Sequence, residues 1–199
     1  MIYIKRIISK KEYGKGYHNY CHNEGLSLLN HAVSCEYPDF DFCEDAIKKG
    51  YRGKPYIEGA QFHYNISHAD GLVVCALSQT EVGIDAESIR ETTDRVMKRC
   101  YSDSEIAYVN SAANKDTEFT RIWTLKESYV KLTGEGIATD LKSVCFDLEQ
   151  AVSFSDELIF LQFAVSDTHI VTVCQRQVSG KIFFSTLNDL SDDIVVIDI

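Results

Sequence analysis

The sequence predicts an α+β protein made of two similar halves related by a pseudo-twofold axis. A strand, a helix and further strands follow one another in the first part of the chain, and the same order recurs after a seam near residues 85–95. The run HIVTVCQ at 169–175 echoes GLVVCAL at 71–77 in the corresponding place. We therefore expect a first half over residues 1–88 and a second half over residues 89–199.

The elements of the first half follow from its apolar pattern. The opening residues, MIYIK, indicate a short strand followed by a basic polar turn. Apolar residues between positions 16 and 33 favour a helix, whereas residues 38–53 are acidic, aromatic and turn-rich. Residues 62–87 predict three short strands with turns at 69–71 and 78–81.

The second half begins with helices and ends with strands. Helices are predicted over residues 92–100, 102–111 and 116–133. Ser102 with Glu105 three residues later is a capping-box pattern, and Gly134 ends the third helix. Alternating apolar residues then predict strands at 143–149, 158–165, 169–176 and 181–185.

Composition excludes several classes of protein. The 199 residues carry a net charge of −10, whereas a nucleic-acid-binding protein needs a basic face. No apolar run reaches the roughly 20 residues of a membrane helix, and the start lacks the pattern of a signal peptide, so we expect a cytoplasmic protein without membrane contact. Seven cysteines without a C-x-x-C pair support neither a disulfide framework nor structural zinc.

Asp85 and Glu87 lie two residues apart in the segment VGIDAE. If this segment ends a strand, both carboxylates point to the same face and converge. Adjacent carboxylates repel, and Mg²⁺, which takes one or two carboxylates plus substrate phosphates, relieves the repulsion. A bare D-x-E is also the pattern of a solvated acidic turn, so the pair alone leaves both interpretations open.

Glu127 and Lys131 lie four residues apart in IWTLKESYVKLTGEG, so a helix places them on one face. A lone pair of this kind is usually a surface ion pair. Opposite a D-x-E pair, however, a third carboxylate and an amine suit phosphoryl transfer. A metal neutralises a diphosphate, a carboxylate accepts a hydroxyl proton, and the lysine stabilises the leaving oxygen.

His68 follows Ser67 at the end of the predicted strand FHYNISH, before a tight turn. Both could donate hydrogen bonds to a phosphate there, although a lone histidine is more often a structural hydrogen-bonding group. Ser67 also lacks the G-x-S-x-G elbow of a hydrolase nucleophile. Lys54 and Pro55 belong to a rigid turn, Gly53-Lys54-Pro55, that presents one cation.

In this order, the segments resemble one family. They are RGKPY (52–56), FHYNISHADGLVVCAL (62–77), VGIDAE (82–87), KRCYSDSE (98–105) and WTLKESYVKLTGEG (123–136). They are similar to the motifs of the 4′-phosphopantetheinyl transferases, above all the larger, pseudo-dimeric branch that activates peptide and polyketide synthetases. The resemblance covers residues 51–150 closely and the strand-rich C-terminus loosely.

The resemblance implies an enzyme of two α+β halves with coenzyme A in the cleft between them. It would transfer 4′-phosphopantetheine to a serine of an acyl- or peptidyl-carrier protein, with Mg²⁺ as its cofactor, and release adenosine 3′,5′-bisphosphate. Residues 1–88 would hold the nucleotide, and residues 89–199 would carry the metal-binding helix and dock the carrier. A chain that holds both halves has no need to dimerise, so we expect a monomer.

The resemblance also implies a role for each motif residue. The metal ligands are Asp85, Glu87 and Glu127. Glu127 is also the general base for the carrier serine, and Lys131 assists at the diphosphate. The residues that line the coenzyme A nucleotide, mostly its adenine and 3′-phosphate, are Lys54, Pro55, Ser67 and His68.

The first predicted helix departs from the family pattern. Family members carry Arg or Lys within and just before it, whereas this chain has His18 and His22. A non-catalytic homologue that binds a carrier protein or coenzyme A is therefore an alternative, as is a Mg²⁺-dependent hydrolase of another diphosphate. For the carrier we expect docking on a basic segment just beyond the metal motif. Its residues are Arg90, Arg95, Lys98 and Arg99, with apolar contacts from Val96 and Met97.

Overall fold

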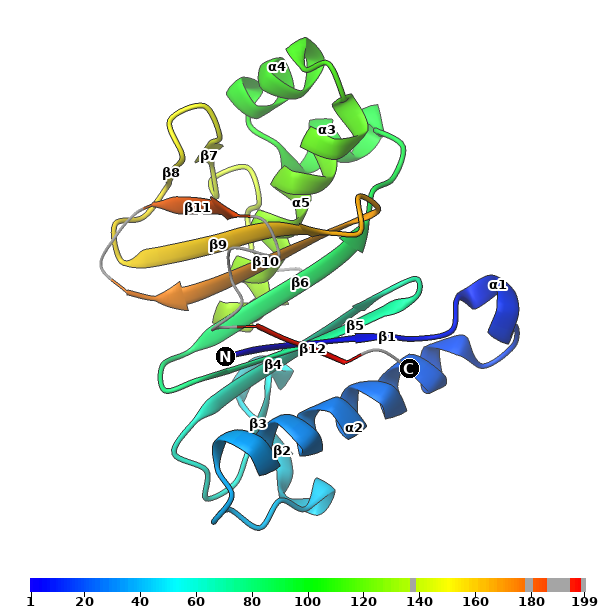
Figure 1. The fold of residues 1–199 in the computed structure, drawn as a ribbon. Helices are drawn as coiled ribbons and strands as arrows, with labels where there is room; N and C mark the ends of the chain where they lie inside the picture. The colour runs from blue at the N-terminus through cyan, green and yellow to red at the C-terminus, as the bar shows by residue number, and fades with distance from the viewer. Residues whose placement is uncertain (137–138, 178–180, 186–193, 198–199) are drawn as a thin grey trace.

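Two four-stranded sheets form the centre of the protein in the computed structural model, which describes residues 1–136, 139–177, 181–185 and 194–197 (Figure 1). The first sheet has the order β12 (Ile194–Ile197), β1 (Ile2–Arg6), β5 (Leu72–Ser78) and β4 (His63–Ala69). The second has the order β11 (Ile182–Ser185), β9 (Leu158–Val165), β10 (His169–Arg176) and β6 (Val82–Ser88). None of the helices in the described ranges is long and apolar enough to cross a membrane.

The two sheets repeat one pattern of strand, helix and hairpin. In the first half, β1 is followed by a helix and by the hairpin β4–β5, and β1 pairs antiparallel with β5. In the second half, β6 is followed by helices and by the hairpin β9–β10, and β6 pairs antiparallel with β10. The segments that echo each other in sequence are β5 and β10, the equivalent strands of the two sheets. The predicted fold of two similar α+β halves is confirmed.

Strand pairing divides the chain differently from the predicted boundary after residue 88. Strand β6 lies before that boundary but forms its backbone hydrogen bonds with β10 of the second sheet. At the other end of the chain, β12 pairs in parallel with β1 of the first sheet, and Figure 1 shows this last strand beside the first. Alternating apolar residues identify strands but not their partners, so the sequence did not predict either exchange.

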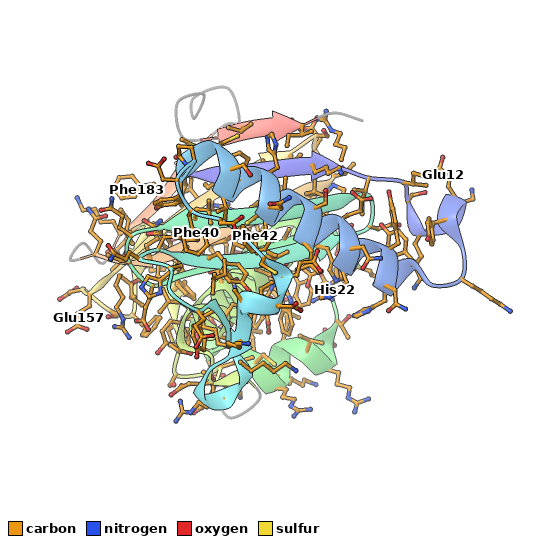
Figure 2. The ribbon with its side chains drawn as sticks, turned by 90° about the horizontal axis from the view of Figure 1, so that it is seen from below. Glu12, His22, Phe40, Phe42, Glu157 and Phe183 are labelled. Carbon is orange, nitrogen blue, oxygen red and sulfur yellow. The ribbon has the colours of Figure 1, made fainter. Side chains whose placement is uncertain are left out.

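Apolar side chains on alternating positions bury three layers of core. One layer lies between the two sheets and includes Ile4, Val74, Ile84 and Val173. A second lies between the first sheet and helix α2 (Tyr17–Glu36), and the third between the second sheet and helix α5 (Lys115–Thr133). Each half is thus a helix on the outer face of a sheet, and Figure 2 shows α2 lying across the first sheet.

Most helix ends agree with the sequence signals. Helix α4 (Asp103–Ser111) begins with the predicted capping box of Ser102 and Glu105, and α5 ends at Gly134, whose φ is 70°. Helix α3 (Asp94–Cys100) precedes them. The predicted basic turn after β1 contains a one-turn helix instead, α1 (Lys10–Tyr13), because Ser9 and Glu12 form a second capping box.

Short strands complete the fold. Strands β2 (Ile47–Lys49) and β3 (Pro55–Ile57) form a small antiparallel pair in the turn-rich segment. Strands β7 (Phe146–Asp147) and β8 (Val152–Ser153) form another, so the strand predicted over residues 143–149 shortens to two residues. In Figure 2, Phe183 on β11 and Glu12 on α1 lie at opposite ends of the molecule.

Candidate active site

The candidate site lies where β6 passes between β4 and α5. Because side chains alternate along a strand, Val82, Ile84 and Ala86 enter the core between the sheets. Asp85 and Glu87 belong to the other set, which faces α5. The predicted strand and the predicted common face of the two carboxylates are confirmed.

Gly83 brings α5 unusually close to this face. A Cβ atom on Gly83 would lie 2.0 Å from the carbonyl oxygen of Ser128 and 2.5 Å from the backbone nitrogen of Leu132. Only glycine permits such an approach of helix backbone to strand backbone. The carboxylates two and four residues further along β6 are therefore held directly beneath the helix.

Side chains of β4 join the first half to β6. The side-chain oxygen of Asn65 accepts a hydrogen bond from the backbone N–H of Ile84 (2.9 Å), and Ser67 Oγ accepts one from Ala86 (3.2 Å). Both side chains are buried. They satisfy backbone donors of β6 that no neighbouring strand reaches on this edge, so the two halves meet at the candidate site.

Lys131, Ser67 and Asp85 form a closed triangle of hydrogen bonds. Lys131 Nζ lies 2.7 Å from Asp85 Oδ1 and 2.7 Å from Ser67 Oγ, and the hydroxyl of Ser67 donates to Asp85 Oδ1 over 3.1 Å. The Asp85 side chain is 5% exposed and that of Lys131 is 28% exposed. The ammonium therefore faces solvent on one side and a buried carboxylate on the other.

Glu127 and Glu87 complete a cluster of negative charge around this triangle. Burial raises the pKa of Glu127, and the charge of Asp85 raises it further. Burial and Asp85 raise the pKa of Glu87 in the same way. The three carboxylates interact electrostatically although they come from two elements, as the predicted D-x-E pair opposite Glu127 requires.

Trp123 and Arg90 hold Glu87 from the side of α5. The indole N–H of Trp123 donates to Glu87 Oε1 over 3.0 Å, and a guanidinium nitrogen of Arg90 lies 4.0 Å from the same oxygen. The guanidinium carbon of Arg90 also lies 5.0 Å from the centre of the Trp123 ring, a cation–π contact. Arg90 is thus part of the site, whereas the sequence assigned it to a docking segment.

The chemistry of the cluster fits one Mg²⁺ ion in part. Asp85 Oδ2 is buried and has no hydrogen-bond partner among the described residues, which leaves an oxygen for a cation. However, no group of three or more His, Cys, Asp or Glu side chains in the described ranges is close enough to hold a metal. The three carboxylates therefore form a cluster of charge but not a ready three-ligand metal site; Lys131 binds Asp85, and Trp123 and Arg90 hold Glu87. They fit a Mg²⁺ ion that takes one or two carboxylates and completes its shell with phosphate and water oxygens.

A cavity of about 660 Å³ opens beside Glu127. Arg95 and Arg99 of α3 line one side of it, and Thr139 and Leu141 line another. Its volume is in the range of small-molecule and cofactor sites. The carboxylate of Glu127 is thus accessible from this cavity, while Asp85 lies behind it in the interior.

The residues predicted to line a nucleotide are separated by the fold. Ser67 is buried in the triangle described above. Lys54 donates to the carbonyls of Leu132 (2.7 Å) and Val82 (3.1 Å), and its burial lowers its pKa. Its ammonium therefore joins the end of α5 to the start of β6 rather than presenting a cation. Pro55 lies beside it in a separate pocket of about 230 Å³.

His68 lies beside His18, at the start of α2. Their rings meet edge to face with centroids 5.7 Å apart, and both residues are exposed. Desolvation of its ring lowers the pKa of His68, and His18 and Lys131 lower it further. His22 lies one turn further along α2 and is exposed as well (Figure 2). Of the two histidines at the positions of the family's cations, His18 is the one next to His68.

Sequence reasoning missed three contributors to the site. Gly83 carried a signal, because a glycine inside an apolar strand indicates a close backbone approach. Asn65 and Trp123 lie in quoted motif segments, but their partners on β6 depend on how the two halves meet and were not predicted. The bond between Lys131 and Ser67 was missed for the same reason.

Several known proteins are similar to this chain in sequence. Residues 81–174, which include β6 and α5, match the model of the 4′-phosphopantetheinyl transferase superfamily. The chain is 36% identical to the 4′-phosphopantetheinyl transferase gsp of Aneurinibacillus migulanus over 106 residues, 52% of this chain and 44% of that protein. It is 34% identical to the 4′-phosphopantetheinyl transferase Sfp of Bacillus subtilis over 138 residues, 67% of this chain and 61% of that protein.

A longer match is found in yeast. The L-aminoadipate-semialdehyde dehydrogenase-phosphopantetheinyl transferase of Saccharomyces cerevisiae is 28% identical over 200 residues, 89% of this chain and 72% of that protein. A holo-[acyl-carrier-protein] synthase structure from Thermotoga maritima aligns with a TM-score of 0.41 and 16% identity, over 49% of this chain and 64% of that chain. The chain spans about half the length of the bacterial relatives that it matches. The chain is thus similar to the 4′-phosphopantetheinyl transferase superfamily, whose model matches residues 81–174.

Proposed function

We propose that this protein transfers the 4′-phosphopantetheine group of coenzyme A to a serine of an acyl- or peptidyl-carrier protein. The observation that supports the proposal most is the cluster of Asp85, Glu127 and Lys131 where the two halves meet, beside a cavity that reaches Glu127. Such a cluster combines negative charge for a metal, a proton acceptor and a cation for a diphosphate. Similarity to the 4′-phosphopantetheinyl transferases supports the same chemistry.

In this proposal Glu127 accepts the proton of the carrier serine. The serine oxygen forms a bond to the phosphorus that carries pantetheine, and the bond from that phosphorus to the bridging oxygen of the diphosphate breaks. Adenosine 3′,5′-bisphosphate leaves with the electron pair of that bond. The raised pKa of Glu127 makes its carboxylate a stronger proton acceptor than an ordinary glutamate, because burial and Asp85 disfavour its charge.

Lys131 and the carboxylates stabilise the diphosphate in this scheme. The Lys131 side chain is 28% exposed, and its ammonium is positioned by Asp85 and Ser67 and offers its remaining donor to a phosphate oxygen. Asp85, with its unpartnered Oδ2, and Glu87 or Glu127 would hold the Mg²⁺ ion together with phosphate oxygens. Bound there, the ion would neutralise the charge of the diphosphate.

In this proposal His68 and His18 bind the nucleotide end of coenzyme A. Lys54 is engaged by two carbonyl oxygens and Ser67 by Lys131, so neither has the free group that the family pattern implied. The two imidazoles lie together at the N-terminal end of α2, where helix N–H groups also favour an anion. We assign the 3′-phosphate to this pair.

For the carrier we propose docking on α3. Arg95, Lys98 and Arg99 are exposed there, and two of them line the cavity that reaches Glu127. Met97 is 3% exposed and belongs to the core, so the prediction that it contacts the carrier is wrong. Val96 is half-buried and lines the same cavity, so it stays part of the proposed surface.

The test is the mass of an apo carrier protein after incubation with coenzyme A and Mg²⁺. The wild-type protein should add one phosphopantetheine group per carrier, and Asp85→Ala or Glu127→Gln should abolish the addition. Glu87→Gln should lower the rate less, because water fills a vacated Mg²⁺ position. Undiminished transfer by Glu127→Gln at saturating Mg²⁺ would remove that residue from the mechanism. Binding of coenzyme A or carrier without any transfer would favour the non-catalytic alternative.

A further inference from the structure

A buried ion pair lies directly behind the candidate active site. Lys126 Nζ of α5 and Glu105 Oε2 of α4 are 2.8 Å apart, and neither side chain is exposed to solvent. Lys126 precedes Glu127, but consecutive side chains on a helix diverge by about 100°. Lys126 therefore points into the second half while Glu127 lines the cavity.

The ammonium of Lys126 uses all three of its donors. Besides the bond to Glu105, Nζ donates to the carbonyl oxygens of Leu141 (2.8 Å) and Val144 (2.5 Å). The rings of Tyr101 and Phe146 lie 5.5 and 5.9 Å from Nζ by their centroids. The ammonium thus replaces hydration with two backbone carbonyls that belong to one segment of the chain.

The carboxylate of Glu105 is equally engaged. It accepts the backbone N–H of Ser102 (2.8 Å), which begins α4, and that of Phe146 (3.0 Å), which begins β7. Together the pair connects α5, the start of α4 and both ends of the segment 141–146. The other hydrogen bonds of this segment are local ones at Asp140 and Lys142 and the short pairing of β7 with β8 at its end.

The anchored segment forms one side of the cavity beside Glu127. Thr139, Asp140 and Leu141 line that cavity, as Arg95 and Arg99 do. A carbonyl of Leu141 that left Lys126 would move this side relative to α5. The width of the cavity beside Glu127 therefore depends on the hydrogen bond between Lys126 and Leu141.

Stability alone does not account for such a pair. Replacing a buried ion pair by apolar side chains of similar volume is often neutral or stabilising, whereas removing one partner alone is strongly destabilising. We infer that Lys126 and Glu105 are positioning residues that hold residues 139–144 as one side of the cavity and so set how the carrier serine approaches Glu127. This inference rests on the proposed function.

The test is the double variant Lys126→Met with Glu105→Leu, which removes both charges together and leaves no unpaired ion. Thermal unfolding should show a folded protein of lower stability than wild type, because four backbone groups lose the side chains that bound them. The KM for the carrier should rise by about tenfold or more, because the cavity loses its set width, while the KM for coenzyme A stays unchanged. Hydrogen–deuterium exchange of amides 141–144 should become faster.

A matched control is the ion pair of Arg121 and Glu118, also on α5 but away from the cavity. Its double replacement, Arg121→Met with Glu118→Leu, should leave both KM values and the exchange of residues 141–144 unchanged. A folded Lys126/Glu105 double variant with wild-type KM for the carrier and wild-type exchange would overturn the inference. Absence of transfer by the wild-type protein would instead sink the proposed function, and the exchange measurement would still test the anchor.

Discussion

Gly83→Ala tests whether the close contact of β6 with α5 sets the geometry of the site. The added Cβ would lie 2.0 Å from the carbonyl oxygen of Ser128, and real Cβ atoms essentially never approach within 3.0 Å. The clashing atoms are backbone, so no side-chain rotation relieves them. The helix must therefore move away from the strand by about 1 Å.

That displacement acts on the pair that carries the proposed chemistry. Lys131 Nζ on α5 and Asp85 Oδ1 on β6 are 2.7 Å apart across the same contact. A misplacement of about 1 Å in an active site lowers the rate by about 10²-fold. Overpacking of this kind also costs about 1–3 kcal/mol of stability. For a chain of this size, that corresponds to a fall of about 2–12 °C in Tm.

The assay combines the initial rate of carrier modification with thermal unfolding. Gly25→Ala is the control, because its Cβ would meet side-chain atoms and no backbone atoms: Ile66 Cγ2 at 3.0 Å and Val73 Cγ1 at 3.8 Å, in the helix-to-sheet contact of the first half. It should keep its kcat and nearly its Tm. A Gly83→Ala protein with wild-type kcat and Tm would show that α5 does not need this approach.

Three further predictions concern charge. Lys131→Met should lower kcat by about 10²-fold and should raise the KM for coenzyme A by a smaller factor, because its ammonium stabilises charge that develops on the diphosphate. An effect on KM alone would make Lys131 a binding contact. The pKa of His68 lies below its usual value near 6.5. Because only the cationic ring attracts the phosphate, the preference for coenzyme A over its 3′-dephospho form should fall as the pH rises through that pKa. A strong, pH-independent preference would contradict this assignment. Arg95→Glu with Lys98→Glu should raise the KM for the carrier by about tenfold at low salt and by a smaller factor at high salt, and should not alter coenzyme A binding. Normal carrier modification by this variant at low ionic strength would refute docking on α3.

Local patterns predicted most elements of the fold because their causes are local. The alternation at 158–165 and 169–176 became β9 and β10 with the same bounds, and the capping box at Ser102 began α4. The pairing of β12 with β1 joins the two ends of the chain and leaves no trace in a local pattern. The sheet to which β6 belongs was unpredictable for the same reason.

The site was predicted in its residues more than in its contacts. Asp85, Glu127 and Lys131 lie together, as their spacing and the family resemblance indicated. Lys54 illustrates the opposite outcome, because a cation expected to be presented by a turn is instead a half-buried donor to carbonyls at the end of α5 and the start of β6. Such tertiary partners follow from the meeting of the two halves, which spacing along the chain does not encode.

The two halves carry one equivalent ion pair between strand and helix, with the acidic and basic residues in opposite places. Tyr3 of β1 and Gly83 of β6 lie opposite Cys75 and Cys174 at matching places in their sheets, and the residue two further along each strand binds the neighbouring helix. In the first half that residue is Lys5, bound to Glu24 of α2; in the second it is Asp85, bound to Lys131 of α5. If the halves descend from one duplicated unit, the acidic and the basic residue of this pair have exchanged places between strand and helix. The exchange left a buried carboxylate on the strand of the second half only. A symmetric frame could then evolve one reaction centre, while the other copy remained free to specialise in holding a ligand.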